Sequence, residues 1–410
     1  MKLFNKIKNI SLLLATGAVF LTACNKLELD PVANTQAAQE TTPTLATLLD
    51  DPNFSILKAA VKKAGLLPTL SVPTLRFTVF APDDAAFTAS GISAGVVAFL
   101  DTATITGLVK YHVVPQVIAA SSIPSSFPNF QYPTILNPKP SVSALLRLTT
   151  FPSVRSGVGA WVNNIPIIAT DIQAVNGVLH KVARVIAPPT LDLWTKINGE
   201  SDLTFLQAAI ARADSGVAVG GRLQDALSIA ANPSAIGSNL TLLAPTDDAM
   251  KAFLIGAITQ ALVAQGLPPA MAQGQATFLV TTYGTLILTN PYALSPVLGA
   301  AITPTLAKGI VAYHILSSQS GTFAPPGIRA FSVNLPATAT AVKTLLNSAI
   351  AIHPGVTMQA TFVSLAPGVS VVAAATVKGA ANATASNLTS LDLHCVNGVM
   401  HKIDQVLRPQ

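Results

Sequence analysis

Charged side chains are scarce in this chain. Asp, Glu, Lys and Arg together make up 10% of its 410 residues, while 50% of the residues are apolar. An average globular domain is about 25% charged, so hydroxyl and amide side chains must solvate much of this surface. The basic residues form no run and have no aromatic side chains interleaved among them. Nucleic-acid binding is therefore not expected.

Cysteines are few, and the common catalytic motifs are missing. There are two cysteines, and the leader described below uses Cys24, so Cys395 has no partner for an internal disulfide. We expect Cys395 to be a small buried side chain, with a reactive thiol as the alternative. The sequence has no phosphate-binding glycine loop, Gly-x-Ser-x-Gly elbow or His-Glu-x-x-His motif. We expect no enzyme, no cofactor and no metal site.

The N-terminus has the pattern of an export signal. Residues 1–8 hold three lysines and no acid, residues 10–20 are apolar, and Leu21-Thr22-Ala23-Cys24 follows. A basic start, a short apolar stretch and small residues before a cleavage site are typical of secretory signals. The last four residues resemble the bacterial lipobox, whereas the alternative, a membrane-spanning helix, needs a longer apolar run. We therefore assign residues 1–23 to a lipoprotein signal peptide and acylation to Cys24.

The residues after Cys24 extend this prediction. Acyl chains on one cysteine anchor a protein to a membrane without a spanning helix. Lys26, Glu28 and Asp30 resemble the charged cluster of surface-exported Bacteroidetes lipoproteins. Residues 24–42 form a predicted flexible tether. We expect a lipid-anchored protein of the cell envelope at the outer membrane, with its modules either exposed at the surface or facing the periplasm.

An internal repeat is the most informative feature of the chain. Residues 175–182, Val-Asn-Gly-Val-Leu-His-Lys-Val, return at 396–403 as Val-Asn-Gly-Val-Met-His-Lys-Ile. Asp171 and Asp392 precede these blocks at the same offset. A repeat of this kind indicates a module built twice. Three further pairs of blocks match in the same order: 53–60 with 202–209, 77–87 with 240–250, and 109–114 with 311–316.

The block at 77–87 and its second copy predict a strand that runs into a helix. A proline ends each copy of the strand, because proline cannot donate to the sheet. Asp83 or Thr246 then caps the helix, and Asp84 or Asp247 suits the positive end of the helix dipole. The alternative for the adjacent acidic residues is a metal or catalytic dyad.

Taken together, the four blocks resemble the fasciclin family. Its modules begin with an apolar helix, carry a Thr-Val-Phe-Ala-Pro block and a Tyr-His pair, and end in an Asn-Gly-Val-hydrophobic-His block followed by Pro. The resemblance covers residues 43–190 and 197–410. It implies an α+β fold of two fasciclin-like modules, each a mostly antiparallel β-wedge with packed α-helices. It also implies a role in cell-surface adhesion and matrix association, without enzymatic activity.

Two features depart from the family pattern. The family usually has an aspartate three residues after the terminal His. The second copy has Asp404 at this position, whereas the first has Ala183. The second module also has an insertion around residues 254–307, within a stretch from 252 to 307 that has no charged residue. Prolines and amides interrupt this stretch, and a bilayer helix would not tolerate them. We expect an apolar insertion in the second module.

Two Asn-Gly dipeptides in the repeat are predicted to form tight hairpin turns. Asn176-Gly177 and Asn397-Gly398 would supply the positive φ angles that such turns need. In the strand that follows, His180 and His401 share a face with aliphatic side chains. We expect each histidine to be neutral, buried in the core and bonded to a backbone carbonyl. These residues are therefore markers of the fold.

The Tyr-His pairs are the candidate ligand-binding neighbourhood. Tyr111-His112 and Tyr313-His314 occupy the position that the resemblance connects with integrin recognition in animal members. Bacteria lack integrins, so only the position carries over, and a buried structural pair is the alternative. A metal hypothesis would pair His112 with His180 and His314 with His401, but no ligand spacing supports it.

These observations favour a binding function. We expect a lipoprotein whose modules bind a surface protein, matrix or polysaccharide, with the membrane as a further partner through Cys24. The alternative is a structural subunit of an outer-membrane assembly that docks through the uncharged insertion, since an uncharged surface suits a buried interface. An enzyme acting on polymers is the third hypothesis, and His112, His180 and Asp171 would be the first residues to replace in testing it.

Overall fold

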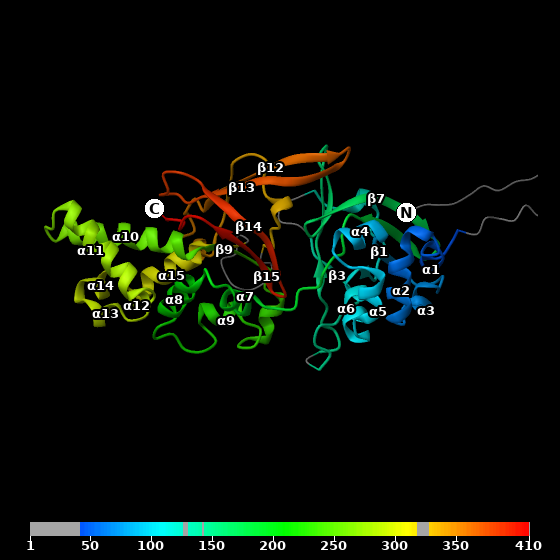
Figure 1. The fold of residues 1–410 in the computed structure, drawn as a ribbon, viewed down its shortest axis with the longest axis horizontal. Coiled ribbons are helices and arrows are strands. Elements are labelled where there is room, and N and C mark those ends of the chain that lie inside the picture. Colours follow the sequence, from blue (N-terminus) through cyan, green and yellow to red (C-terminus); the bar gives the residue numbers. More distant parts are fainter. Residues whose placement is uncertain (1–41, 126–129, 142, 318–327, 410) are drawn as a thin grey trace, which may run out of the picture. The chain divides into compact units, whose positions relative to one another are not determined.

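Two modules of the same architecture follow one another along the chain (Figure 1). The computed structural model describes residues 42–125, 130–141, 143–317 and 328–409. The predicted signal peptide, the predicted acylation site Cys24 and nearly all of the predicted tether lie outside the described residues.

The first module is built on a six-stranded sheet with the order β2-β1-β8-β7-β6-β5. Only the pair β1–β8 is parallel, and the other four pairs are antiparallel. The strands are β1 (Phe77–Pro82), β2 (Val113–Val114), β5 (Pro152–Arg155), β6 (Gly159–Val162), β7 (Ile165–Ala174) and β8 (Gly177–Val182), with a separate small pair of β3 (Tyr132–Pro133) and β4 (Thr149–Thr150). The helices are α1 (Leu45–Leu48), α2 (Ser55–Lys63), α3 (Leu67–Leu70), α4 (Asp84–Ala89), α5 (Ala94–Phe99) and α6 (Thr102–Tyr111).

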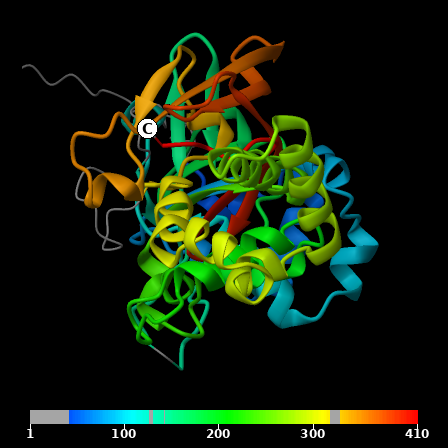
Figure 2. The ribbon, with the colours of Figure 1, turned by 90° about the vertical axis from the view of Figure 1, so that its left-hand side faces the viewer.

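The second module repeats this sheet with one more strand, in the order β10-β9-β15-β14-β13-β12-β11. Its strands are β9 (Leu240–Pro245), β10 (Ile315–Leu316), β11 (Thr340–Val342), β12 (Val356–Ala366), β13 (Val369–Lys378), β14 (Ser386–Cys395) and β15 (Gly398–Ile403). Its helices are α7 (Leu193–Gly199), α8 (Thr204–Ala213), α9 (Leu223–Leu227), α10 (Asp247–Ala264), α11 (Pro269–Tyr283), α12 (Leu286–Thr289), α13 (Pro291–Leu294), α14 (Pro296–Ala301) and α15 (Pro304–Tyr313). Figures 1 and 2 show the green and yellow helices gathered beneath the orange strands.

Both central strands have the same environment. β1 and β9 are buried along their whole length, as expected for continuous apolar runs inside a sheet. Each pairs in parallel with the last strand of its module, with Phe77 opposite Gly177 and Leu240 opposite Gly398. The shared register confirms the predicted α+β fold of two modules with mostly antiparallel sheets.

Helix caps follow the central strands as predicted. The side chain of Asp83 accepts a hydrogen bond from the Ala86 N–H at 2.9 Å, and that of Thr246 accepts one from the Ala249 N–H at 3.4 Å. A side-chain oxygen at this position satisfies an amide that has no partner within the helix. The strand-to-helix block therefore forms the same local structure in both modules.

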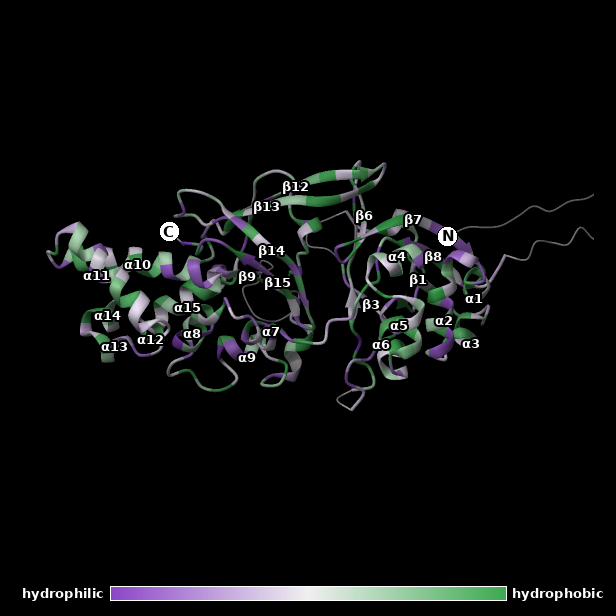
Figure 3. Cartoon of the chain, viewed as in Figure 1, coloured by the Kyte–Doolittle hydropathy of each residue, from purple (hydrophilic) through white to green (hydrophobic). Residues whose placement is uncertain are grey.

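The insertion of the second module folds as helices. It contains most of α10 and all of α11 to α14, and apolar side chains from these helices join the core formed with α8 and β9. Its prolines lie mainly at helix starts, as in α11, α13 and α14, where a missing N–H costs nothing. Figure 3 shows these helices mostly in green and pale shades. Among the described residues, no helix is long and apolar enough to cross a membrane.

Candidate functional site

In the first module, the Tyr-His pair is buried at the end of α6. Tyr111 is fully buried, and its hydroxyl donates to the carbonyl oxygen of Thr149 at 2.9 Å. The Nε2 of His112 accepts a hydrogen bond from the Ile186 N–H at 2.9 Å, so the proton of the neutral ring is on Nδ1, which donates to the Leu108 carbonyl at 2.8 Å. Burial in a poorly hydrated environment lowers the pKa of His112 to about 4.

The second pair repeats these contacts. The hydroxyl of Tyr313 donates to the Gly355 carbonyl at 2.5 Å. The Nδ1 of His314 donates to the Ile310 carbonyl at 2.7 Å, and its Nε2 accepts from the Leu407 N–H at 2.9 Å. Burial lowers the pKa of His314 to about 4 as well. Each histidine thus ties the end of a helix to the chain after the last strand, which is the structural alternative left open by the sequence.

The structure contains the predicted hairpin but distributes its φ angles differently. The turn residues of the first hairpin are Val175 and Asn176, and neither has a positive φ, whereas Gly177 has a φ of 152°. Instead, the buried Asn176 side chain accepts from the Leu45 N–H and donates to the Leu70 carbonyl, both at 2.8 Å. The asparagine is therefore a connector that joins the N-terminal helices to the hairpin.

Asn397 makes the equivalent contacts in the second module. Its side chain accepts from the Leu193 N–H and donates to the Leu227 carbonyl, both at 2.9 Å. The two asparagines therefore have one function, which is to satisfy buried backbone groups of an adjacent helical segment.

Close approach of backbones explains the glycines. A Cβ atom on Gly177 would lie 1.9 Å from the carbonyl oxygen of Phe77, and one on Gly398 would lie 2.5 Å from that of Leu240. These are the first residues of the parallel pairing between the first and last strands. A side chain at either position would push the two strands apart.

The repeated histidine of the terminal block holds the segment that follows β2. The Nε2 of His180 is 2.7 Å from the Ile118 carbonyl, and its Nδ1 accepts from the Asp171 N–H at 3.2 Å. Asp171 has a φ of 57° at an irregularity of β7, and its carboxylate accepts from the Ala120 N–H at 2.9 Å. The hydroxyl of Thr78 accepts from the Ile118 N–H at 2.8 Å. Three polar side chains therefore fix one segment.

The second module has the same arrangement. The Nε2 of His401 is 2.8 Å from the Ala330 carbonyl, and its Nδ1 accepts from the Asp392 N–H at 3.2 Å. Asp392 has a φ of 58°, and its carboxylate accepts from the Ser332 N–H at 2.6 Å. The hydroxyl of Thr241 accepts from the Ala330 N–H at 2.8 Å. The repeated threonine was visible in the sequence but went unassigned.

The repeated histidines and aspartates use, in hydrogen bonds to the backbone, the groups that a metal or catalytic site would need. Both ring nitrogens of each repeated histidine bond to backbone groups. In the described part of the chain, no group of three or more His, Cys, Asp or Glu side chains is placed to hold a metal ion. The acid after each helix-capping residue bonds to the first turn of another helix, since Asp84 accepts from the Ile56 N–H and Asp247 from the Phe205 N–H, both at 2.9 Å.

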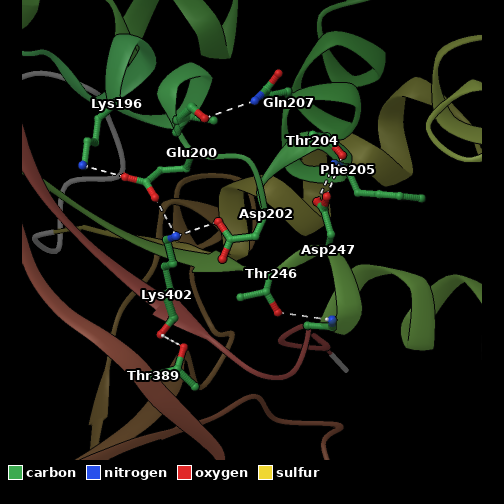
Figure 4. Close-up of polar contacts among 12 residues, drawn as sticks. Lys196, Glu200, Asp202, Thr204, Phe205, Gln207, Thr246, Asp247, Thr389 and Lys402 are labelled. Atoms are coloured by element: carbon green, nitrogen blue, oxygen red, sulfur yellow. Dashed lines mark hydrogen bonds and ion pairs between the residues drawn. The ribbon is translucent and has the colours of Figure 1, made fainter.

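The repeated lysines pair with different acids in the two modules. Lys181 forms an ion pair of 2.9 Å with Asp83. The second module has Thr246 at the position of that acid, and Lys402 instead binds two carboxylates (Figure 4). They belong to Glu200 at 2.7 Å and Asp202 at 2.6 Å. The second module thus has no acid at the helix cap, and its lysine pairs with acids of a different segment instead.

Residues outside the repeat join the two modules. Residues 42–410 form one compact unit. The indole of Trp161 donates to the Ser370 carbonyl at 3.0 Å, and a guanidinium nitrogen of Arg155 donates to the Leu335 carbonyl at 2.6 Å. The guanidinium of Arg155 also lies 4.7 Å from the ring centroid of Phe362. We call this contact region the joint.

A buried arginine lies in the joint. Arg329 is 3% exposed and donates to the carbonyls of Cys395 and Val396 at 3.1 and 2.9 Å. Its guanidinium packs 4.9 Å from the ring centroid of Phe151, and its Nε has no partner among the described residues. Burial lowers the pKa of Arg329 to about 10 and raises that of the Cys395 thiol to about 12. Cys395 is buried, as predicted, while no sequence signal marked Arg329.

Several hollows lie at the surface of the described structure. One of about 320 Å³ lies between α10 and the chain after β15. Another of about 300 Å³ lies at the joint beside Trp161 and Arg155. An apolar one of about 130 Å³ lies between α10 and α15. None of the predicted site residues lines any of them.

Comparison with known proteins identifies a family match and two bacterial relatives. Residues 52–188 match the fasciclin domain. The chain is 33% identical over 159 residues to Protein sll1483 of Synechocystis, covering 38% of this chain and 78% of that protein. It is also 33% identical over 145 residues to the uncharacterized Synechocystis protein sll1735, covering 34% of this chain and 92% of that protein.

Two further similarities involve animal proteins. The chain is 30% identical over 157 residues to transforming growth factor-beta-induced protein ig-h3 of Sus scrofa, which is 36% of this chain and only 20% of the porcine protein. Among solved structures, it is similar to a FAS1 domain pair from the insect cell adhesion molecule fasciclin I, with 14% identity and a TM-score of 0.31 over 86% of this chain and 95% of that one. The chain belongs to the fasciclin-domain family.

Proposed function

We propose that this protein is an adhesion lipoprotein of the cell envelope. Acylated Cys24 anchors it to the outer membrane, and residues 24–42 tether two fasciclin modules that bind a surface protein, matrix or polysaccharide. The signal-like leader, the membership of the fasciclin family and the hydroxyl- and amide-rich composition support this function.

One structural observation carries the proposal. The histidines, asparagines and aspartates of the terminal and Tyr-His blocks that recur in both modules bond to backbone groups, as His112, His180, Asn176 and Asp171 do. A scaffold uses polar residues in this way, because buried polar groups must be satisfied. The recurring polar residues thus stabilise the fold of each module. We infer that ligands bind to the surfaces on which the two modules differ.

Adhesion and anchoring have separate tests. A strain lacking the gene is expected to lose adhesion to its surface or matrix, and unchanged adhesion and glycan binding would refute the function. Cys24→Ser is expected to abolish fatty-acid labelling and release the protein from the membrane. Protease treatment of intact cells is expected to cut the modules, whereas full protection would place them inside and rule out adhesion.

A specific observation favours a second candidate, a structural subunit of an outer-membrane assembly. The uncharged insertion exposes Met271, Phe278 and Tyr292 by 65%, 58% and 61%. Exposed apolar side chains on an uncharged surface are typical of protein contacts. A pull-down from membranes should then recover a stoichiometric partner that is lost in Phe278→Ser and kept in Phe99→Ser, a matched change of an exposed phenylalanine in the first module. Recovery of no such partner would exclude this candidate.

A further inference from the structure

The hollow between α10 and the end of the chain has the form of a groove. Its volume is about 320 Å³, within the range of small-molecule sites. One wall is α10, where Ala252, Gly256 and Ala257 are exposed and leave room, and Phe253 lies among them. The other wall is formed by residues 382–384, 404–406 and 408. We call this hollow the α10 groove.

Only the second module can form this groove. In the first module the corresponding helix, α4, ends at Ala89, whereas α10 continues to Ala264. Gly256 and Gln260 therefore have no counterparts. The other wall differs too, since Asp404 replaces Ala183. The start of the insertion thus supplies one wall of a site that the repeat alone does not contain.

The second wall is held rigidly. The carboxylate of Asp404 accepts from the Ser386 hydroxyl and the Asn387 N–H, both at 2.8 Å. The Asn382 side chain accepts from the Arg408 N–H at 2.7 Å and donates to the Val406 carbonyl at 2.9 Å. A wall fixed before binding loses little entropy when a ligand arrives.

The chemistry of the groove indicates the ligand class. Asp404 and Arg408 contribute one charge of each sign, so the lining carries no net charge. The remaining polar side chains are amides and hydroxyls, and the Gln260 amide and the Arg408 guanidinium have no partner among the described residues. Phe253 and the alanines offer an apolar surface beside them. This combination suits a ligand with one apolar face and several hydroxyl groups.

We propose that the α10 groove binds one pyranose unit of a neutral polysaccharide. The apolar face of the sugar packs on Phe253 and the adjacent alanines, and its hydroxyls bond to the Gln260 amide and the Arg408 guanidinium. This inference rests on the proposed binding function and names the ligand class and the site.

Two glycines on neighbouring helices provide a matched test. A Cβ atom on Gly256 in α10 or on Gly274 in α11 would meet no atom within 4 Å, and both residues are exposed. Gly256→Phe fills the α10 groove, and Gly274→Phe adds the same side chain away from it. Full-length protein in detergent is run through gels containing dextran, mannan, galactan or polygalacturonate. At least one neutral polysaccharide should retard the protein, with affinity reduced roughly tenfold or more in Gly256→Phe and unchanged in Gly274→Phe.

Several results would overturn the inference. They are retardation by no neutral polysaccharide, retardation only by polygalacturonate, and equal retardation of both glycine variants. Should Gly256→Phe fail to fold by circular dichroism, Gln260→Ala replaces it, because it only shortens an exposed side chain. This variant is expected to bind several-fold more weakly, and unchanged binding would refute the groove.

Failure of the groove and failure of the adhesion function can be told apart. If cells with Gly256→Phe adhere like the parent while the deletion strain does not, the groove is wrong and the adhesion function stands. If the deletion strain itself adheres like the parent, the adhesion function is wrong.

Discussion

The indole nitrogen of Trp161, in the first module, donates a 3.0 Å hydrogen bond to the carbonyl oxygen of Ser370 in the second. The hydroxyl of Ser370 donates in return to the Val158 carbonyl at 2.8 Å. Trp161 is 1% exposed and belongs to an apolar cluster with Phe331 and Val399 of the second module. The two modules therefore share buried surface, and their stabilities are coupled.

Trp161→Ala should destabilise the joint by about 3–5 kcal/mol, since it leaves a cavity and an unpaired carbonyl. Urea unfolding followed by circular dichroism is expected to change from one transition to two as the modules uncouple. Phe99→Ala is the control, because Phe99 is 91% exposed and its loss should change stability by less than about 0.5 kcal/mol. A single, unshifted transition in Trp161→Ala would show that the joint contributes nothing.

Lys402→Met should cost more stability than Lys181→Met. Lys402 pairs with two carboxylates and has 13% of its side chain exposed, while Lys181 pairs with one acid and has 27% exposed. Because Asp202 is 45% exposed, solvent weakens the effect, and we expect a loss of ~1–2 kcal/mol for Lys402→Met. Urea midpoints of the two variants at pH 7 check this, and equal losses would contradict it.

The same network predicts an acid dependence. Hydrogen bonds from Lys196 and then Lys402 lower the pKa of Glu200 below its ordinary 4.5. For an acid whose folded pKa is depressed, the stabilisation is present above the ordinary pKa and lost as the pH falls through the folded pKa. Wild-type stability should therefore decline below about pH 4.5. The decline of stability with falling pH should be shallower in Lys402→Met. An unchanged slope of stability against pH would show that Lys402 does not contribute to the acid dependence.

The buried His112 and His314 predict a second loss of stability, which begins at a higher pH than the loss caused by Glu200. Their pKa falls from 6.5 to about 4 on folding, so between these values only the unfolded chain binds the protons. Stability is then greatest above pH 6.5 and falls toward pH 4, by at most about 1.4 kcal/mol per pH unit for each histidine. Urea unfolding at pH 7.5 and 5.0 tests this. His112→Gln should reduce the slope, and NMR signals of His112 that titrate near pH 6.5 would refute the prediction.

Gly177→Ala should prevent stable folding of the first module, because the new Cβ would meet the Phe77 carbonyl oxygen at 1.9 Å. Gly256→Ala is the matched control, since its Cβ meets open space inside a helix and should stabilise it by roughly 0.5–1 kcal/mol. Expression level and thermal melting of both variants are the measurements. A well-folded Gly177→Ala protein would show that the parallel strands can separate at no cost.

Sequence patterns predicted local structure well where neighbouring residues determine it. The strand ending at Pro82, the cap at Asp83 and the buried His180 depend on short-range hydrogen bonding and alternation of side chains. The hairpin was predicted correctly, but the positive φ expected of Asn176 was wrong, because turn statistics describe the loop alone. Asn176 instead bonds to Leu45 and Leu70, which are distant in sequence and unrelated to the turn.

For the candidate site, too, the sequence showed local patterns but not which distant residues meet. Tyr111 and His112 were selected because the family resemblance connects their position with recognition, yet both side chains bond to the backbone of their own module. The α10 groove uses Gly256 and Gln260, which occur once and resemble any exposed helical residues in the sequence. No local pattern shows that they face Gln405 across a hollow.

By itself, the sequence determined that this protein consists of one module built twice, because the same short-range patterns of strand, cap and hairpin appear in the same order in both halves. It also determined that the insertion would be uncharged. Only the tertiary structure decided how Lys402 recruits Glu200 and Asp202, how Trp161 reaches Ser370, and where a groove opens. These contacts join residues far apart along the chain, and their energies depend on a geometry that exists only after the chain has folded.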